Sequence, residues 1–244
     1  MHRYKFILIR PLQMIPVLFG VSIISFFLIK SIPGDPVRIM LGSRASAEVI
    51  EAVRAQYGLD EPLFVQYFYF LYNFIQGDLG KSIIFKIPVI ELVFKRIEPT
   101  FFLLIYSLIL SIIIALFLSI YAVKNQGKFI DQIIRFFCTV GVGIPAFWLG
   151  IMYMIFFCIF LKIFPVSGYG DNFLEHLYHL FLPSLTIATA LSPVLIRNLR
   201  SSLIHEMSSD YVDAAQSKGL NDKYIFNQHI LKNSLVPTIN LLGV

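Results

Sequence analysis

The sequence contains few charged residues for its length. Asp, Glu, Lys and Arg make up 14% of the 244 residues, whereas 57% are hydrophobic and the mean hydropathy is +0.75. A soluble chain of this size needs more charged side chains to cover its surface, so the composition excludes an ordinary soluble globular protein. It predicts a protein embedded in a lipid bilayer.

Cysteine and clustered metal ligands are also scarce. Cys138 and Cys158 both lie in one apolar run, where cysteine usually serves as a small buried hydrophobic side chain. They provide neither a disulfide framework nor a zinc ligand set. Glu175, His176 and His179 have helical spacing, but no further ligand is evident nearby, so we interpret the histidines as an interfacial pair and expect no bound metal.

Charged residues are absent from four runs that are long enough to cross a hydrocarbon core of about 30 Å as helices. Strands of a barrel would alternate in polarity, whereas Ile109–Ile114 is apolar on every face. The predicted fold class is therefore an all-α polytopic membrane protein. The four predicted spans are Pro11–Ile29, Thr100–Val123, Phe136–Leu161 and His176–Ile196.

The sequence contains no recognisable catalytic side chains. No nucleophile, metal set or acid–base pair stands out, so no catalytic residue is assigned and the chain is not expected to be an enzyme. Gly77–Ser82 (GDLGKS) ends like a phosphate-binding loop, but Ile75 occupies the place of its first glycine. We expect no nucleotide or other cofactor on this chain.

Basic residues near the span ends predict the orientation, because Lys and Arg in short loops resist translocation. Eleven of them fall on one side, which we assign to the cytoplasm together with the N-terminus. The first span lacks an A-x-A-like cleavage site and is read as retained rather than as a signal peptide. The eleven are Arg3, Lys5, Arg10, Lys124, Lys128, Arg135, Arg197, Arg200, Lys218, Lys223 and Lys232.

The segment 33–99 is predicted to lie outside the cytoplasm and to contain short helices. Ala45–Tyr57 has an amphipathic pattern with Ser46 as a plausible N-cap and Gly58 at its end. Phe64–Ile75 carries seven aromatic residues but is too short to cross a bilayer. An interfacial or packed helix is favoured, because tyrosine prefers the depth of the lipid headgroups.

A proline interrupts the third apolar run. Pro145 in GVGIPAFWLG removes a helix hydrogen bond and should kink or break the span next to Phe147 and Trp148. Broken helices line substrate pathways in some transporters and serve only packing in other proteins. Both interpretations of Pro145, Phe147 and Trp148 remain open from the sequence.

The polar segment after the fourth run predicts a helix, a sharp turn and a second helix. Ser209 or Asp210 begins the first helix, and Gly219 provides the left-handed residue that ends it, with Leu220 placed for an apolar contact. Asn221 then caps the second helix. This ordered pattern favours a docking element for another protein over a simple surface loop.

At these residues the chain resembles the membrane-spanning subunits of ABC importers, which carry an E-A-A-x-x-x-G signature. Here it reads Asp213-Ala214-Ala215-x-x-x-Gly219, with aspartate in place of glutamate. Further blocks are similar to the dipeptide, oligopeptide and nickel permease branch. They are SIPGDPV (31–37), YGLDEPLFVQY (57–67), GDLGKS, IPAFWLG, FPVSGYG (164–170), DYV, KGL, His229 and KNSLVP.

The resemblance implies a type I ABC importer transmembrane fold in a bacterial inner membrane. Residues 1–32 would form the first span and its N-terminal segment, and 100–244 the transmembrane core with a coupling loop at 197–235. The implied partners are a second permease subunit, two ATPase subunits that use ATP and Mg, a solute-binding protein and the bilayer, with no nucleic acid. The implied contacts with an ATPase are Tyr211, Asp213, Ala214, Ala215, Lys218, Gly219 and Leu220.

Two features leave alternatives open. The resemblance leads us to expect two further spans after the coupling loop, whereas the sequence contains only the start of one, at 236–244. Di- or oligopeptides are the expected substrate class, with nickel, glutathione or glycosides as alternatives within the branch. A stand-alone channel or secondary carrier is a further alternative, although no ionisable group lies at mid-span to couple an ion.

Overall fold

The computed structural model describes residues 2–31, 34–42, 45–56, 58–82 and 84–242, and the chain divides into two compact units. Unit 1 comprises Met1–Arg96 and unit 2 comprises Ile97–Val244. Helices dominate both units, and the pairing between Lys81 and Pro88 is an isolated bridge outside any strand. The predicted all-α fold class is confirmed.

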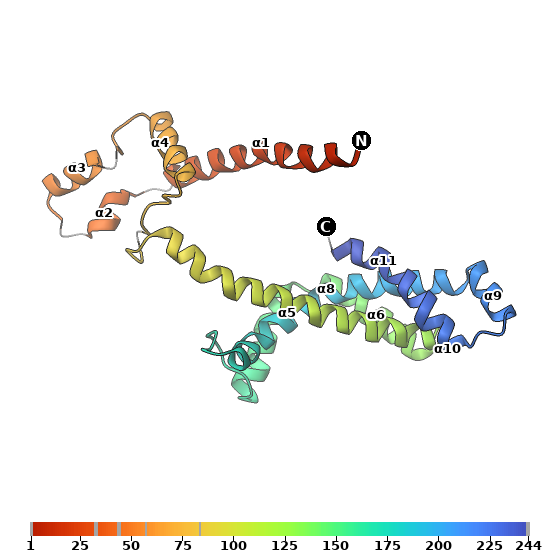
Figure 1. The fold of residues 1–244 in the computed structure, drawn as a ribbon. Helices are drawn as coiled ribbons and strands as arrows, with labels where there is room; N and C mark the ends of the chain where they lie inside the picture. The colour runs from red at the N-terminus through yellow and green to blue at the C-terminus, as the bar shows by residue number, and fades with distance from the viewer. Residues whose placement is uncertain (1, 32–33, 43–44, 57, 83, 243–244) are drawn as a thin grey trace. The chain divides into compact units, whose positions relative to one another are not determined.

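Unit 1 begins with the long helix α1 (His2–Ser31), followed by α2 (Pro36–Leu41), α3 (Ala47–Gln56) and α4 (Leu63–Ile75) (Figure 1). Tyr67 of α4 is 7% exposed and packs edge-on against Phe19 and Phe26 of α1. Its hydroxyl lies 2.8 Å from Ser22 Oγ. The aromatic helix is therefore packed on α1, with Tyr67 as its buried contact.

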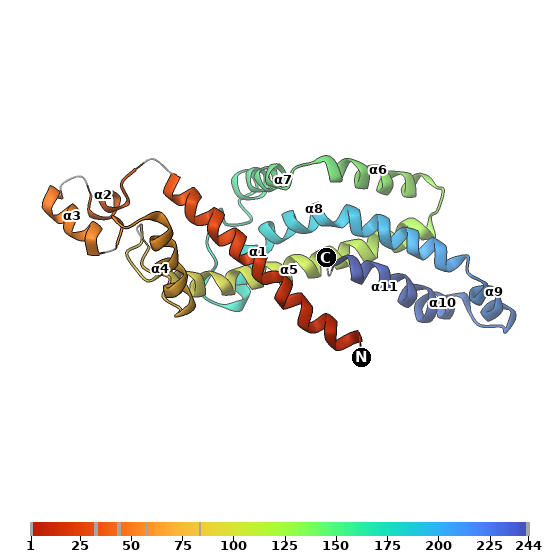
Figure 2. The same ribbon diagram turned by 90° about the horizontal axis from the view of Figure 1, so that it is seen from above.

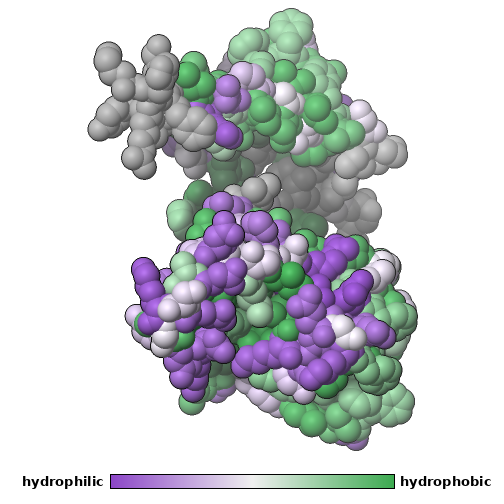
Figure 3. Space-filling model, turned by 90° about the vertical axis from the view of Figure 1, so that its right-hand side faces the viewer, coloured by the Kyte–Doolittle hydropathy of each residue, from purple (hydrophilic) through white to green (hydrophobic). Residues whose placement is uncertain are grey.

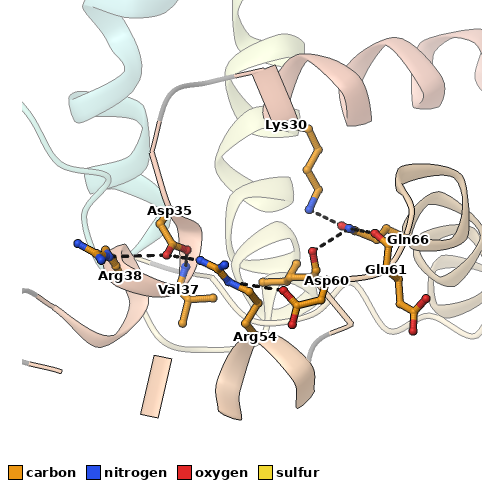
Figure 4. Close-up of polar contacts among 9 residues, drawn as sticks. Lys30, Asp35, Val37, Arg38, Arg54, Asp60, Glu61 and Gln66 are labelled. Atoms are coloured by element: carbon orange, nitrogen blue, oxygen red, sulfur yellow. Dashed lines mark hydrogen bonds and ion pairs between the residues drawn. The ribbon is translucent and has the colours of Figure 1, made fainter. Parts of the chain in front are cut away.

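Polar side chains hold the short helices of unit 1 together (Figure 4). Asp35 accepts a hydrogen bond from the Val37 amide at 3.0 Å, which caps α2, and another from Arg54 Nη2 of α3 at 2.6 Å. Lys30 at the end of α1 donates to Gln66 Oε1 of α4 at 2.5 Å. These contacts connect α2 to α3 and α1 to α4.

Unit 2 is built around two long helices, α5 (Val89–Lys124), which begins in unit 1, and α8 (Phe173–Met207). Between them the chain forms α6 (Phe129–Gly143), α7 (Ala146–Tyr153) and the short π-helix η1 (Met154–Phe160). After α8 come α9 (Asp210–Ser217), α10 (Asp222–Ile225), the π-helical turn η2 (Phe226–Ile230) and α11 (Leu231–Leu242). Figure 2 shows α8 between α6 and α11, and both pack against it.

Three helical stretches in the described part of the chain are long and apolar enough to cross a membrane: Ile9–Ser31, Val89–Lys124 and Phe173–Met207. A fourth crossing requires counting α6 with Ala146–Phe160 as one span, although the two are bent by 106°. The third predicted run, Phe136–Leu161, is therefore not one straight helix. Pro145 is the physical reason, since it lacks the amide proton that a continuous helix needs.

The helices extend beyond the apolar runs that predicted them. α5 starts at Val89 rather than Thr100, and its first turns carry a Glu91–Lys95 ion pair of 2.7 Å at the i,i+4 spacing that favours helix. α8 continues through Arg197 to Met207, so the first part of the predicted loop 197–235 is helical. Apolar runs reflect contact with lipid, whereas helix ends are determined by local hydrogen bonding.

Small buried side chains let α5 approach α8 closely. They recur along α5 on one face, and the Ser119 hydroxyl donates to the Ile196 carbonyl of α8 at 3.2 Å. On α6, a Cβ added to Gly141 would lie 3.0 Å from Pro193 Cγ of α8. Close approach of this kind is typical of helix packing in membranes. The α5 residues are Ser107, Ser111, Ala115, Ser119 and Ala122.

Candidate functional site

The candidate docking element is a pair of short helices that follows the end of α8. We call residues 209–225, which contain α9 and α10, the α9–α10 hairpin. Ser209 occupies the N-cap position of α9 with an extended backbone, but its side chain makes no capping bond there. Its hydroxyl donates instead to the His205 carbonyl at 3.1 Å, so Ser209 holds the predicted N-cap position without a side-chain capping bond, and Asp210 is the first residue of the helix.

The sharp turn of the α9–α10 hairpin is centred on Gly219. This glycine has φ +79°, and its amide donates to the Gln216 carbonyl at 2.8 Å while the Leu220 amide donates to the Ala215 carbonyl at 3.2 Å. The two bonds form a Schellman ending, which requires a left-handed residue at this place. A Cβ on Gly219 would meet no atom within 4 Å, so the requirement is for backbone conformation and not for space.

The second helix starts immediately after the turn. Asn221 Oδ1 accepts a hydrogen bond from the Lys223 amide at 2.9 Å, which confirms Asn221 as the N-cap of α10. Gln216 Nε2 donates to Asp222 Oδ1 at 3.2 Å and thereby connects the two helices across the turn. Hydrogen bonds therefore fix both the turn of the hairpin and the start of α10.

Two buried side chains attach the hairpin to the body of unit 2. Val212 of α9 is 5% exposed and Ile225 of α10 is 1% exposed. Both belong to a hydrophobic cluster with Leu199 and Leu203 of α8, Val123 of α5 and Ile230. The hairpin is thus packed directly on α8.

The outer surface of the hairpin is open. Asp213, Ala214, Lys218, Gly219 and Leu220 are exposed, whereas Ala215 is partly buried against the cluster beneath. Figure 3 looks at the end of unit 2 that carries the hairpin and shows hydrophilic residues around a smaller apolar area. This exposed, mixed surface is suited to a protein contact.

Tyr211 has a contact within the chain that the sequence did not indicate. Its hydroxyl donates to Glu206 Oε2 of α8 at 2.7 Å, and Asn233 Nδ2 of α11 lies 3.5 Å from both groups. Burial and the hydrogen bond to the Glu206 carboxylate raise the pKa of Tyr211 above its usual value. Tyr211 therefore positions the hairpin on α8 and α11.

The predicted kink lies at the start of α7. Pro145 is the N-cap of α7 with an extended backbone, and Phe147 lines a cavity of about 450 Å³ between α7, η1, the loop before α8 and α8 itself. Trp148 is 46% exposed and is not among the lining residues. Of the three kink residues, only Phe147 contacts this cavity.

Three side chains at the start of α8 form hydrogen bonds with the loop that precedes it. They are Glu175, His176 and His179. His176 Nδ1 lies 2.8 Å from the Tyr169 carbonyl oxygen, and its ring stacks on the Tyr169 ring. His179 Nδ1 lies 3.2 Å from the Ser167 carbonyl oxygen, and Glu175 accepts from the Asp171 amide at 2.8 Å. Within the described residues, no group of three or more His, Cys, Asp or Glu could hold a metal ion.

The chain thus combines several helices that are long and apolar enough to cross a membrane with an exposed helical hairpin that follows α8. Residues 115–244 match the family described as binding-protein-dependent transport system inner membrane component, and residues 3–115 match the N-terminal region of such components. The chain belongs to this family of ABC transport permeases.

Individual relatives cover nearly the whole chain. It is 34% identical over 240 residues to the glutathione transport system permease protein GsiC of Escherichia coli O6:H1, an alignment that covers 98% of this chain and 77% of the relative. It is also 34% identical over 245 residues to the oligopeptide transport system permease protein AppB of Bacillus subtilis, covering 98% of this chain and 78% of the relative. These relatives are consistent with a multi-pass protein of a bacterial inner membrane.

Proposed function

We propose that this chain is the permease subunit of an ATP-driven importer for di- or oligopeptides and that it forms half of the translocation pathway. The α9–α10 hairpin is the observation that carries the proposal. Its turn is closed by two backbone hydrogen bonds, its outer face is exposed, and its inner face is anchored to α8 by Val212 and Ile225. A docking element that transmits force needs all three properties.

The coupling step follows from this geometry. An ATPase subunit binds the exposed surface formed by Asp213, Ala214, Lys218, Gly219 and Leu220. When two ATPase subunits close on ATP and Mg, they move the hairpin, and α8 moves with it as a rod of 35 residues, about 52 Å long at 1.5 Å per residue. Rigid-body movement of this kind underlies alternating access in transporters.

The substrate proposal rests on the relatives. One is named for glutathione transport and the other for oligopeptide transport, and both cargoes are peptides. A second permease subunit completes the pathway, and a solute-binding protein outside the membrane delivers the peptide. The eleven basic residues predict that the N-terminus and the hairpin lie on the cytoplasmic side, where the ATPases would bind.

Disulfide or bifunctional crosslinking tests the docking surface. In a background with Cys138 and Cys158 replaced by alanine, we expect Ala214→Cys, which is exposed on α9, to crosslink to the ATPase in membranes of the producing cells. The control is Ser167→Cys, which is equally exposed but lies in the loop before α8, at the other end of that helix (Figure 1). Capture of the ATPase by both positions, or by neither, would contradict the assignment.

Uptake of a labelled dipeptide tests the function itself. We expect uptake to require the ATPase and the binding protein and to be inhibited by an excess of unlabelled peptide. Uptake that persists without the ATPase would instead support a channel or a secondary carrier. ATP-dependent uptake of labelled glutathione but not of labelled dipeptides would keep the ATP-driven importer and change its substrate.

A further inference from the structure

A buried ion pair connects α6 to α8 in unit 2. Arg200 Nε donates to Asp131 Oδ1 and Arg200 Nη2 donates to Asp131 Oδ2, each at 2.7 Å. The Asp131 side chain is 1% exposed and that of Arg200 is 18% exposed. Two parallel bonds between a guanidinium and a carboxylate fix both distance and orientation, more strictly than a single contact does.

The same carboxylate also holds the turn between α5 and α6. Asp131 Oδ2 accepts a hydrogen bond from the Gly127 amide at 3.2 Å, and Gly127 has φ +75° within that turn. Three elements therefore meet at one side chain: the turn after α5, the first turn of α6, and α8. The Asp131–Arg200 pair determines where α6 begins relative to α8.

Arg200 lies on the part of α8 that carries the α9–α10 hairpin. Leu199 and Leu203, on either side of it, are fully buried in the cluster that contains Val212 and Ile225. The far end of α6 is also close to α8, at Gly141 and Pro193, directly before the 106° bend into α7. A path of packed contacts thus runs from the hairpin through α8 and α6 to the broken segment at Pro145.

A stable fold does not require a charge pair at this place. Apolar side chains of similar volume often replace buried ion pairs without loss of stability, whereas charge pairs fix one arrangement among several. We propose that Asp131 and Arg200 are positioning residues that make α6 and α8 move as one body when the hairpin is displaced. This inference rests on the proposed coupling of the hairpin to an ATPase.

The test measures peptide transported per ATP hydrolysed in the assembled transporter reconstituted in vesicles. We expect Asp131→Asn, which removes the charge, to lower this ratio about five-fold or more, in line with the usual size of coupling between distant sites. Arg200→Lys keeps the charge but loses the two parallel bonds and should give an intermediate ratio. The ATPase rate itself should fall less than transport does.

A matched control separates positioning from simple loss of stability. Ile134 of α6 is 8% exposed, packs in the neighbouring apolar cluster and carries no charge or hydrogen-bonding group. Ile134→Ala should lower the thermal stability of the assembly but leave the transport-to-ATP ratio unchanged. Equal ratios in Ile134→Ala and Asp131→Asn, at comparable loss of stability, would overturn the positioning role.

Spin labels provide an independent readout of the movement. With labels at Lys128→Cys before α6 and Ser208→Cys after α8, both exposed, the distance should stay the same with and without ATP. In Asp131→Asn, the distribution of distances between the two labels should broaden or shift upon ATP binding. An unchanged narrow distance in that variant, together with normal coupling, would overturn the inference while leaving the wild-type importer intact. Absence of ATP-dependent uptake in the wild type would refute the proposed function itself.

Discussion

Gly219 is the residue with the clearest backbone requirement at the candidate site. Its positive φ and the two hydrogen bonds around it end α9 and allow Asn221 to start α10. Because no neighbouring atom would meet a Cβ, a substitution acts through conformation and leaves the packing beneath unaltered. The position therefore permits a test of turn geometry with little disturbance elsewhere.

We predict that Gly219→Val leaves the protein in the membrane but reduces ATP-driven uptake strongly. A side chain in the left-handed region costs roughly 1–2 kcal/mol, which is enough to shift the turn and too little to unfold the chain. Uptake and membrane abundance should be measured together. Gly219→Asn is the control, because asparagine tolerates this conformation and should retain most of the activity. Wild-type uptake by the valine variant would refute the role of the turn.

Among the elements, the α9–α10 hairpin depends on its buried side. Ile225 is 1% exposed and Val212 is 5% exposed, while the neighbouring Tyr224 is 51% exposed. The hairpin is short, and α9 and α10 have eight and four residues, so neither helix is stable alone in water. Tertiary packing on α8 supplies the missing stability.

We predict that Ile225→Ala loosens the hairpin without unfolding unit 2. Loss of a buried isoleucine side chain costs about 2–5 kcal/mol. Amide hydrogen exchange across residues 209–225 should accelerate, and coupling of ATP hydrolysis to uptake should weaken. Tyr224→Ala should change exchange little, because exposed substitutions usually stay within about 0.5 kcal/mol. Similar exchange in both variants would show that Ile225 is not an anchor.

The short helices of unit 1 depend on one carboxylate. Burial raises the pKa of Asp35, but the Val37 amide and the Arg54 guanidinium outweigh burial and hold the pKa below its usual value. A carboxyl group with a lowered pKa in the folded state stabilises it above the pKa of the unfolded chain, near 4. That contribution is lost as the pH falls through the lower folded value.

We predict that α2 and α3 stay protected from proteolysis between neutral pH and about pH 5, which lies above the ordinary pKa of an aspartate. Asp35→Asn should become protease-sensitive already at neutral pH, because the charged partner of Arg54 is lost. Asp60→Asn is the control, since Asp60 is 56% exposed and lies 3.9 Å from Arg54. Limited proteolysis over a pH series measures the protection of the wild type and of both variants. An acid-stable protease is used at the lowest pH values. Protection lost in wild type near neutral pH would contradict the argument.

For the whole molecule, orientation in the membrane decides which surface meets the ATPase. The basic residues predict that the N-terminus, the turn after α5 and the α9–α10 hairpin share the cytoplasmic side. The segment around Gly80 and the loop around Ser167 should then face outward.

We predict that a membrane-impermeant thiol reagent applied to intact spheroplasts labels Ser167→Cys but not Ser217→Cys. Both positions are exposed, so a difference reports the side of the membrane and not burial. Cys138 and Cys158 are replaced by alanine in both variants. Labelling of Ser217→Cys in intact cells would place the hairpin outside and remove the basis for ATPase docking.

Local patterns in the sequence determined much of the molecule. Apolar runs predicted the membrane class and the all-α fold, and the sequence around Gly219 and Asn221 predicted the helix, turn and helix of the hairpin, because caps and left-handed glycines act over a few residues. Ser209 occupies the N-cap position, but its hydroxyl bonds to the His205 carbonyl of α8 and not to an amide of α9, a competition between neighbours that the pattern alone does not resolve.

Contacts between distant residues were decided only by the tertiary structure. Tyr211 with Glu206 and Asn233, Asp131 with Arg200, and Val212 and Ile225 in one cluster all join different helices. The sequence shows that each of these residues exists and what chemistry it has. Which pairs meet depends on how α6, α8 and α11 pack, and that packing comes from the sum of many small contacts that no local pattern encodes.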